Sequence, residues 1–157
     1  MTTKLAFFDF DGTISVPEYL VDGEIKVGYP TVPSWIDYCN AGGKDAYKTC
    51  RPVKPVQRYA DKLRENGAKL YILTGIRSEG EVLAKIEFLK DHYEGYFEDM
   101  LTVSSPEEKL GVIRETAARE GVALTDCELI EDMYPTLLGV LAGGIKATHI
   151  SQIVADL

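Results

Sequence analysis

The sequence predicts an α/β protein in which a parallel sheet of five strands lies between two layers of helices. Short apolar segments alternate along the chain with helical segments, which is the order of parallel strands joined by crossover helices. Polar or acidic residues directly follow several of the apolar segments, and one stretch, residues 14–52, interrupts the alternation. The length of 157 residues suits a single domain, 1–157, with a core of useful size.

Five short apolar runs read as strands. They cover residues 5–8, 69–73, 100–103, 127–130 and 145–150. Capping-box patterns at residues 78–81 and 105–108 open two of the helices between them, and Pro55 and Pro135 open the other two. The expected apolar helix faces are Val56, Tyr59, Ala60 and Leu63; Val82, Ile86 and Leu89; Leu110, Ile113 and Ala117; and Leu137, Leu138 and Leu141.

Residues 14–52 form an insertion between the first strand and the first crossover helix. Asp22-Gly23 lies between two short strand-like runs, which is a strong signal for a type I′ hairpin. A short helix is expected to begin at Pro33-Ser34 and to end near Gly42-Gly43. Because open α/β sheets bind ligands at the carboxyl ends of their strands, where this insertion emerges, we expect it to act as a lid or small cap.

The first strand ends in two aspartates separated by one residue, Asp9 and Asp11. Gly12 permits the sharp turn that leaves the strand, so the two carboxylates can converge on one point. Two carboxylates so close together at pH 7 need a cation or a shared proton. The pattern therefore indicates a divalent ion, an acid/base pair, or both.

The run from Phe7 to Ile14, with the sequence DFDGT at its centre, resembles motif I of the haloacid dehalogenase (HAD) superfamily. Thr74-Gly75, which follows the second strand, resembles motif II, and its hydroxyl and free N–H groups suit a phosphate oxygen. Lys109 resembles the lysine of motif III; it adds positive charge to a helix N-terminus, which is favourable only beside an anion. The rival lysines, Lys85 and Lys90, are expected inside a helix and away from the strand ends.

Glu131-Asp132, after the fourth strand, resembles motif IV, which completes a metal site. The resemblance spans residues 4 to about 150 outside the insertion. It implies a Rossmann-like fold with a small flap-type cap, and Mg²⁺-dependent hydrolysis of a phosphomonoester through an aspartyl-phosphate. Asp9 would be the nucleophile and Asp11 the acid/base. Mg²⁺ would be held by Asp9, the Asp11 carbonyl and Asp132, with Glu131 as a further candidate, and Thr74, Gly75 and Lys109 would bind the phosphoryl group.

Substrate identity is less constrained, and a small phosphorylated metabolite or a nucleotide is expected. Tyr19, Trp35, Tyr38 and Arg77 are the candidate specificity residues. Trp35, Tyr38 and Tyr47 offer stacking faces for a base or sugar, although core packing is expected for at least one of them. A nucleotide or polynucleotide-end phosphatase, a phosphotransferase and a catalytically inactive phosphoryl-binding module stay open. A phospho-receiver domain would carry its acceptor aspartate after the third strand, where this chain has Thr102-Val103-Ser104-Ser105.

Composition narrows the partners further. The net charge of −8 argues against a general electrostatic grip on long nucleic acid or on an anionic membrane. No apolar run is long enough to span a bilayer, and the N-terminus lacks the layout of a signal peptide, so a cytoplasmic location is expected. Cys39, Cys50 and Cys127 are expected as free thiols, although a Cys39–Cys50 disulfide stays open, as does the oligomeric state.

Overall fold

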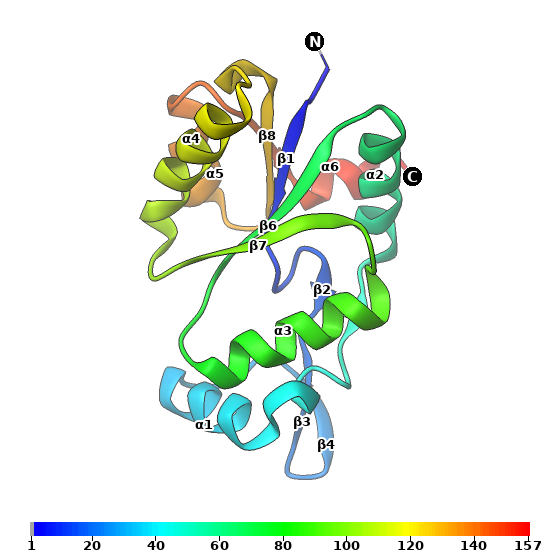
Figure 1. Ribbon diagram of the computed structural model, residues 1–157. Coiled ribbons are helices and arrows are strands. Elements are labelled where there is room, and N and C mark those ends of the chain that lie inside the picture. The colour runs from blue at the N-terminus through cyan, green and yellow to red at the C-terminus, as the bar shows by residue number, and fades with distance from the viewer. Residues whose placement is uncertain (1) are drawn as a thin grey trace.

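The protein is built on a five-stranded, all-parallel sheet with strand order β7-β6-β1-β8-β9 (Figure 1). The computed structural model describes residues 2–157. The strands are β1 (Leu5–Phe8), β6 (Lys69–Gly75), β7 (Phe97–Val103), β8 (Cys127–Glu131) and β9 (Lys146–His149). The predicted α/β fold with five core strands is therefore confirmed, and its layers make it Rossmann-like.

Helices cover both faces of the sheet. The helices α2 (Lys54–Glu65), α3 (Glu79–His92) and α6 (Ile150–Ala155) pack on one face, and α4 (Lys109–Glu120) and α5 (Tyr134–Ala142) pack on the other. Successive residues of a strand point to opposite faces, so β1 feeds two cores. Ala6 and Phe8 belong to the core beneath α2 and α3, and Leu5 and Phe7 to the core beneath α4 and α5.

The order of the strands determines where a ligand can bind. The strand β1 is central, and its neighbours in the sheet are β6 and β8. The chain reaches β6 through α2 on one face, and it reaches β8 through α4 on the opposite face. Such a reversal of winding opens a crevice at the carboxyl ends of the central strands. The residues that follow β1, β6 and β8 therefore meet at one edge of the sheet.

The insertion between β1 and α2 lies beyond this edge (Figure 1, lower part). It contains β2 (Ser15–Val16), β3 (Glu18–Val21), β4 (Glu24–Val27), α1 (Val32–Gly42) and β5 (Arg51–Pro52). The predicted hairpin and helix are both present, and Asp22 and Gly23 have the positive φ angles, 52° and 78°, that a type I′ turn requires. Short 3₁₀ turns cover Gly43–Asp45, Pro106–Glu108 and Leu124–Asp126.

Close packing against α3 fixes the position of the insertion. A Cβ atom added to Gly80, in the first turn of α3, would overlap the carbonyl oxygen of Cys39 in α1. The missing side chain therefore allows the two helices to touch through their backbones.

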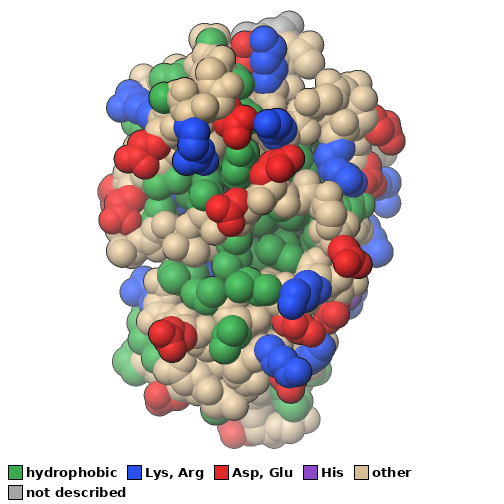
Figure 2. All heavy atoms as spheres, viewed as in Figure 1, with side chains coloured by type: hydrophobic (Ala, Val, Ile, Leu, Met, Phe, Trp, Pro, Cys, Tyr) green, Lys and Arg blue, Asp and Glu red, His purple; other side chains and the backbone are tan. Residues whose placement is uncertain are grey.

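Two helix faces differ from the prediction. In α3 the predicted stripe of Val82, Ile86 and Leu89 lines an open groove of about 520 Å³ beside the edge strand β7, and of the three only Leu89 also packs against the core. Figure 2 shows apolar side chains exposed across this part of the surface. The buried face of α3 instead carries a pair of charged residues, Glu81 and Lys85.

In α5 the prediction of Leu138 and Leu141 as core residues is wrong, because both side chains are exposed. Leu137 is buried as predicted, and Val140, which was not predicted, is buried with it. At the C-terminus the predicted fifth strand, 145–150, is shorter, and α6, which begins at Ile150, was not predicted. His149 opens this helix, since its Nδ1 accepts a hydrogen bond of 3.0 Å from the backbone N–H of Ser151.

Cys39, Cys50 and Cys127 are buried free thiols, so the Cys39–Cys50 disulfide that the sequence left open does not form. Within residues 2–157, no helix has both the length and the apolar character that crossing a bilayer demands.

Candidate active site

The chain turns sharply as it leaves β1. The backbone N–H of Asp9 still bonds to the Ile130 carbonyl at 3.0 Å, which continues the pairing of β1 with β8. The Phe10 carbonyl then accepts hydrogen bonds from the N–H groups of residues 13, 14 and 15, and Gly12 adopts a φ of +79°. As a result Asp9 and Asp11 line the same cavity, of about 300 Å³, at the carboxyl edge of the sheet.

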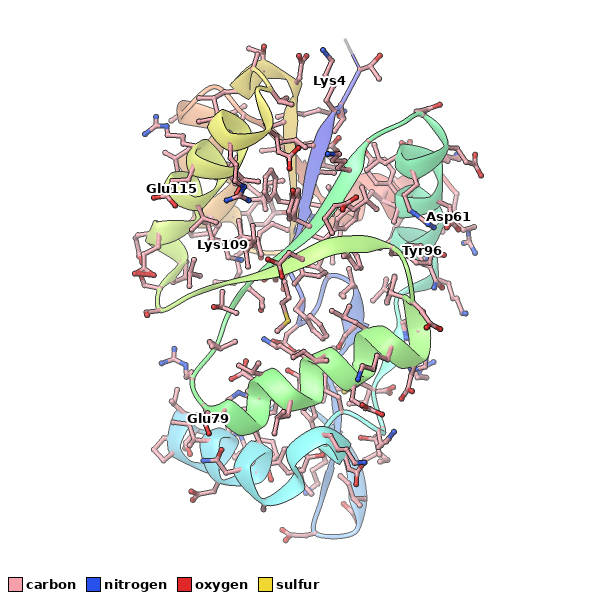
Figure 3. The ribbon with its side chains drawn as sticks, in the orientation of Figure 1. Lys4, Asp61, Glu79, Tyr96, Lys109 and Glu115 are labelled. Carbon is pink, nitrogen blue, oxygen red and sulfur yellow. The ribbon has the colours of Figure 1, made fainter. Side chains whose placement is uncertain are left out.

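Lys109 reaches this cavity from the first turn of α4 (Figure 3). Its Nζ lies 2.9 Å from Asp9 Oδ1 and 2.7 Å from Glu131 Oε2. The preceding turn is fixed by Glu108, whose Oε2 accepts a 2.7 Å hydrogen bond from the Ser104 N–H and a longer one from Ser105. The capping-box sequence therefore positions the lysine, which is only 4% exposed.

Asp9 and Lys109 each stabilise the charged form of the other. Burial alone would raise the pKa of Asp9, but the Lys109 ammonium, with weaker contributions from Glu131 and Lys85, holds that pKa below its usual value. Burial would likewise lower the pKa of Lys109, but Asp9 and Glu131 raise it. Asp9 is therefore a carboxylate at neutral pH, which is the form that a nucleophile needs.

A third carboxyl group, that of Asp132, lies beside the two that contact this ammonium. Asp9, Glu131 and Asp132 each offer an oxygen, and these oxygens lie within 4.8 Å of one another. Burial and the charge of Asp9 raise the pKa of Glu131, and burial also raises the pKa of Asp132. Gly12 allows this approach, since a Cβ atom there would lie 2.7 Å from Asp132 Oδ2.

The donor set fits a hard divalent cation, because it consists of carboxylate oxygens with an excess of negative charge. The two oxygens of Glu131 already have partners, since Oε2 accepts from Lys109 and Oε1 accepts from the Asp132 N–H at 3.2 Å. Asp9 and Asp132 are consequently better placed than Glu131 to offer a free oxygen to a cation.

Thr74 and Gly75, at the end of β6, line the same cavity as Asp9. The Thr74 side chain is buried, and its hydroxyl contacts a second lysine, Lys85, whose Nζ lies 2.8 Å from Thr74 Oγ1. The expectation that Lys85 lies away from the strand ends is therefore wrong. Its exposed neighbour on α3, Lys90, lines the groove beside β7.

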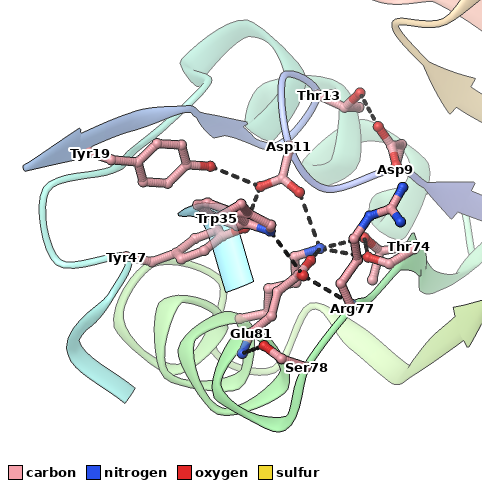
Figure 4. A network of polar contacts seen from close by, with 12 residues as sticks. Asp9, Asp11, Thr13, Tyr19, Trp35, Tyr47, Thr74, Arg77, Ser78 and Glu81 are labelled. Atoms are coloured by element: carbon pink, nitrogen blue, oxygen red, sulfur yellow. Dashed lines mark hydrogen bonds and ion pairs between the residues drawn. The ribbon is translucent and has the colours of Figure 1, made fainter. Parts of the chain in front are cut away.

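Asp11 is held by donors from two parts of the chain (Figure 4). Its Oδ1 accepts hydrogen bonds from the hydroxyls of Tyr19, at 3.2 Å, and Tyr47, and its Oδ2 lies 3.1 Å from Lys85 Nζ. Tyr47 is 2% exposed, so it offers no stacking face to a ligand. Burial and the charge of Asp11 raise the pKa of Tyr47 well above its usual value, so the phenol stays protonated and can donate.

The other candidate specificity residues differ in position. Trp35 and Arg77 line the cavity that contains Asp9, and Trp35 also borders a shallower aromatic hollow beside Asp11 and Tyr19. Tyr38 instead packs on Trp35 and donates its hydroxyl to the Ala46 carbonyl at 2.7 Å.

Three residues of the site differ from the expectation: Lys85 was expected away from the strand ends, Glu81 only in a helix cap, and Tyr47 as a stacking face or a core residue. One signal was available for the first two. Glu81, Ala84, Lys85 and Phe88 follow an i, i+3, i+4, i+7 spacing, which is the spacing of a buried helix face that contains an oppositely charged pair. No local pattern links Tyr47 to Asp11, because 36 residues separate them.

Comparison with solved structures identifies proteins of similar fold. No protein-family model matches the chain, and no curated protein matches its sequence. A putative phosphoglycolate phosphatase from Lactobacillus delbrueckii is 14% identical with a TM-score of 0.63, over 95% of this chain and 86% of that one. A haloacid dehalogenase-like hydrolase from Streptococcus pneumoniae is 16% identical with a TM-score of 0.56, over 98% and 90%.

A third similar structure is the N-terminal, phosphatase-containing part of the Bacteroides fragilis protein BF1531, complexed with Mg. It is 16% identical with a TM-score of 0.57, over 93% of this chain and 35% of that one. The chain thus has the fold of haloacid dehalogenase-like hydrolases, as the four sequence motifs predict.

Proposed function

We propose that the protein is a Mg²⁺-dependent phosphomonoester hydrolase that works through an aspartyl-phosphate on Asp9. The observation that carries the proposal is the contact between the ionised Asp9 and Lys109 at the end of the central strand. A carboxylate nucleophile beside a fixed ammonium suits a reaction in which an anionic phosphoryl group must approach a negative charge.

In the first half of the reaction, an Asp9 oxygen attacks phosphorus and the bond from phosphorus to the ester oxygen breaks. The leaving oxygen takes a proton from Asp11 and departs as an alcohol. Lys109 and the Thr74-Gly75 end of β6 bind the phosphoryl oxygens, since they line the same cavity as Asp9.

In the second half, Asp11 takes a proton from water, and the hydroxide formed attacks phosphorus. The bond between phosphorus and the Asp9 oxygen breaks, which releases inorganic phosphate and restores the carboxylate. Unaided hydrolysis of phosphate monoesters is among the slowest reactions known, so the site must supply much electrostatic stabilisation.

Asp9 and Asp132 would hold the Mg²⁺ ion, together with the Asp11 carbonyl. When bound, the ion offsets the repulsion between the carboxylates and the incoming phosphoryl group. Glu131 would support this site without binding the ion directly, because its oxygens accept hydrogen bonds from Lys109 and from the backbone of Asp132.

A small phosphorylated metabolite or a nucleotide is the proposed substrate class. The cavity of about 300 Å³ accommodates a small ester, and the structural neighbours include proteins named as phosphatases. The insertion is proposed to contact the leaving group through Trp35, as is Arg77, whereas Tyr19 is only 3% exposed and its hydroxyl holds Asp11.

A panel of phosphomonoesters tests the proposal by release of inorganic phosphate, with Mg²⁺ and with excess chelator. We expect turnover of at least one ester that chelator abolishes and Mg²⁺ restores. Adding an alcohol acceptor separates hydrolysis from phosphotransfer, because transfer to the acceptor produces a new ester in place of inorganic phosphate. Phosphate binding with no turnover of any ester would instead indicate an inactive binding module.

A further inference from the structure

Lys85 is a fully buried lysine close to the proposed chemistry. Its side chain has no exposed surface, and its Nζ lies among four oxygens. Two of them are the Thr74 hydroxyl at 2.8 Å and the Gly75 carbonyl at 3.0 Å, both at the end of β6. The other two belong to the carboxylates of Glu81, at 2.7 Å, and Asp11, at 3.1 Å.

Glu81 neutralises the charge of Lys85, but it does not explain why the ammonium lies at the end of β6. The two residues are four apart on α3 and could neutralise each other anywhere along the helix. Glu81 is itself fixed, because its Oε1 accepts hydrogen bonds from the Trp35 indole at 3.0 Å and from the Arg77 N–H at 3.1 Å. The pair is therefore anchored at one end to the insertion and at the other end to β6.

The remaining oxygen contact of the ammonium is the one to Asp11, which lies on the loop after β1. Asp11 receives Lys85 on Oδ2 and the two tyrosine hydroxyls, Tyr19 and Tyr47, on Oδ1 (Figure 4). These donors come from α3 and from the insertion, so the carboxylate is fixed from both sides. An acid/base group needs this kind of support, because its reach to the reacting oxygen depends on side-chain orientation.

We propose that Lys85 is a positioning residue for Asp11, with Glu81, Thr74 and the Gly75 carbonyl fixing the ammonium in place. The proposal rests on the proposed phosphatase function and deepens it. Lys85 differs in role from Lys109, which contacts Asp9 and binds the phosphoryl group, because Lys85 acts through the residue that transfers the proton.

A double-mutant cycle between Lys85→Met and Asp11→Asn tests this role. Lys85→Met alone should lower kcat by about 10²-fold, the size of effect that a 1 Å misplacement of a reacting group can produce, and should leave KM nearly unchanged. In the Asp11→Asn background the same substitution should cost little more, because the group that Lys85 positions has already lost its function.

The leaving group supplies a second readout. An alkyl phosphate needs a proton on its leaving oxygen, whereas p-nitrophenyl phosphate releases a stable anion. Lys85→Met should therefore slow the alkyl ester more than the aryl ester. A side chain that served only the stability of the core would slow both by the same factor.

Lys85→Met leaves the Glu81 carboxylate buried without a cation, which endangers folding. The neutral variant Glu81→Gln/Lys85→Met avoids this, since a glutamine oxygen can still accept from Trp35 and Arg77, and the cycle is repeated on it. Lys90→Met, at an exposed position of the same helix, is the matched control and should keep the wild-type rates.

If Lys85→Met lowers kcat by the same factor in the wild-type and Asp11→Asn backgrounds, the positioning role is overturned. The same holds if it slows both esters by the same factor. Neither result contradicts the phosphatase function. Wild-type protein that hydrolyses neither ester would instead overturn the proposed function, and this role with it.

Discussion

Lys109→Met should destabilise the protein before any substrate is added. Methionine keeps the length of the side chain but removes the ammonium that lies 2.9 Å from Asp9 and 2.7 Å from Glu131. The side chains of the three residues are only 6%, 13% and 2% exposed, so water cannot replace the lost partner. Removing one member of a buried ion pair costs about 3–5 kcal/mol.

The lower end of this range applies, because Glu131 can escape the penalty. Burial and the charge of Asp9 raise its pKa to about 9, so this carboxyl is mostly protonated at neutral pH, and Asp9 is the charge that the loss of Lys109 leaves unpaired. A loss of about 3 kcal/mol corresponds to a fall in Tm of roughly 6–12 °C for a chain of this size.

Thermal unfolding in buffer with excess chelator measures the effect. Lys90→Met is the control and should change stability by less than about 0.5 kcal/mol, because that lysine is exposed. Adding Asp9→Asn to Lys109→Met should recover part of the lost Tm, since it removes the charge left behind. A Lys109→Met variant that melts as the control does would refute the buried, charge-paired site.

Three further outcomes follow from the structure. Asp132→Ala should raise Tm without metal, because it removes one of several crowded carboxylates, and should weaken Mg²⁺ binding measured by calorimetry; unchanged binding would exclude Asp132 as a ligand. Gly80→Ala should cost about 1–3 kcal/mol, because its methyl group would overlap the Cys39 carbonyl oxygen, whereas Gly111→Ala, with open space around it, should not destabilise α4. Trp35→Ala should change the ranking of esters in a substrate panel, and a uniform loss across the panel would show that the indole serves packing alone.

The central strands β1, β6 and β8 could be predicted because they are buried and mostly apolar, and Asp9, Thr74 and Asp132 could be placed because they lie at or directly after the ends of these strands. These residues line one cavity with Lys109, which the capping box at residues 105–108 places at the start of α4. Their chemical roles stay predictions until the variants are measured.

The errors arose where tertiary contacts override local pattern. On α3 the apolar stripe containing Val82 suggested the wrong buried face, because the helix buries an ion pair whose partner, Asp11, lies about seventy residues earlier in the chain. On α5 the run containing Leu138 is apolar on more than one face, so periodicity alone could not choose between them. The last helix is short, and its cap is a histidine, which is not among the usual N-cap residues.

The most direct measurement is the detection of phosphate on Asp9. Protein mixed with a phosphate ester and Mg²⁺ is quenched in acid and analysed by mass spectrometry, with wild type, Asp11→Asn and Asp9→Asn compared. We expect a phosphoryl adduct on Asp9 that accumulates in Asp11→Asn, where water activation is lost, and that is absent from Asp9→Asn together with all turnover. Appreciable hydrolysis by Asp9→Asn, or an adduct on another residue, would contradict the mechanism.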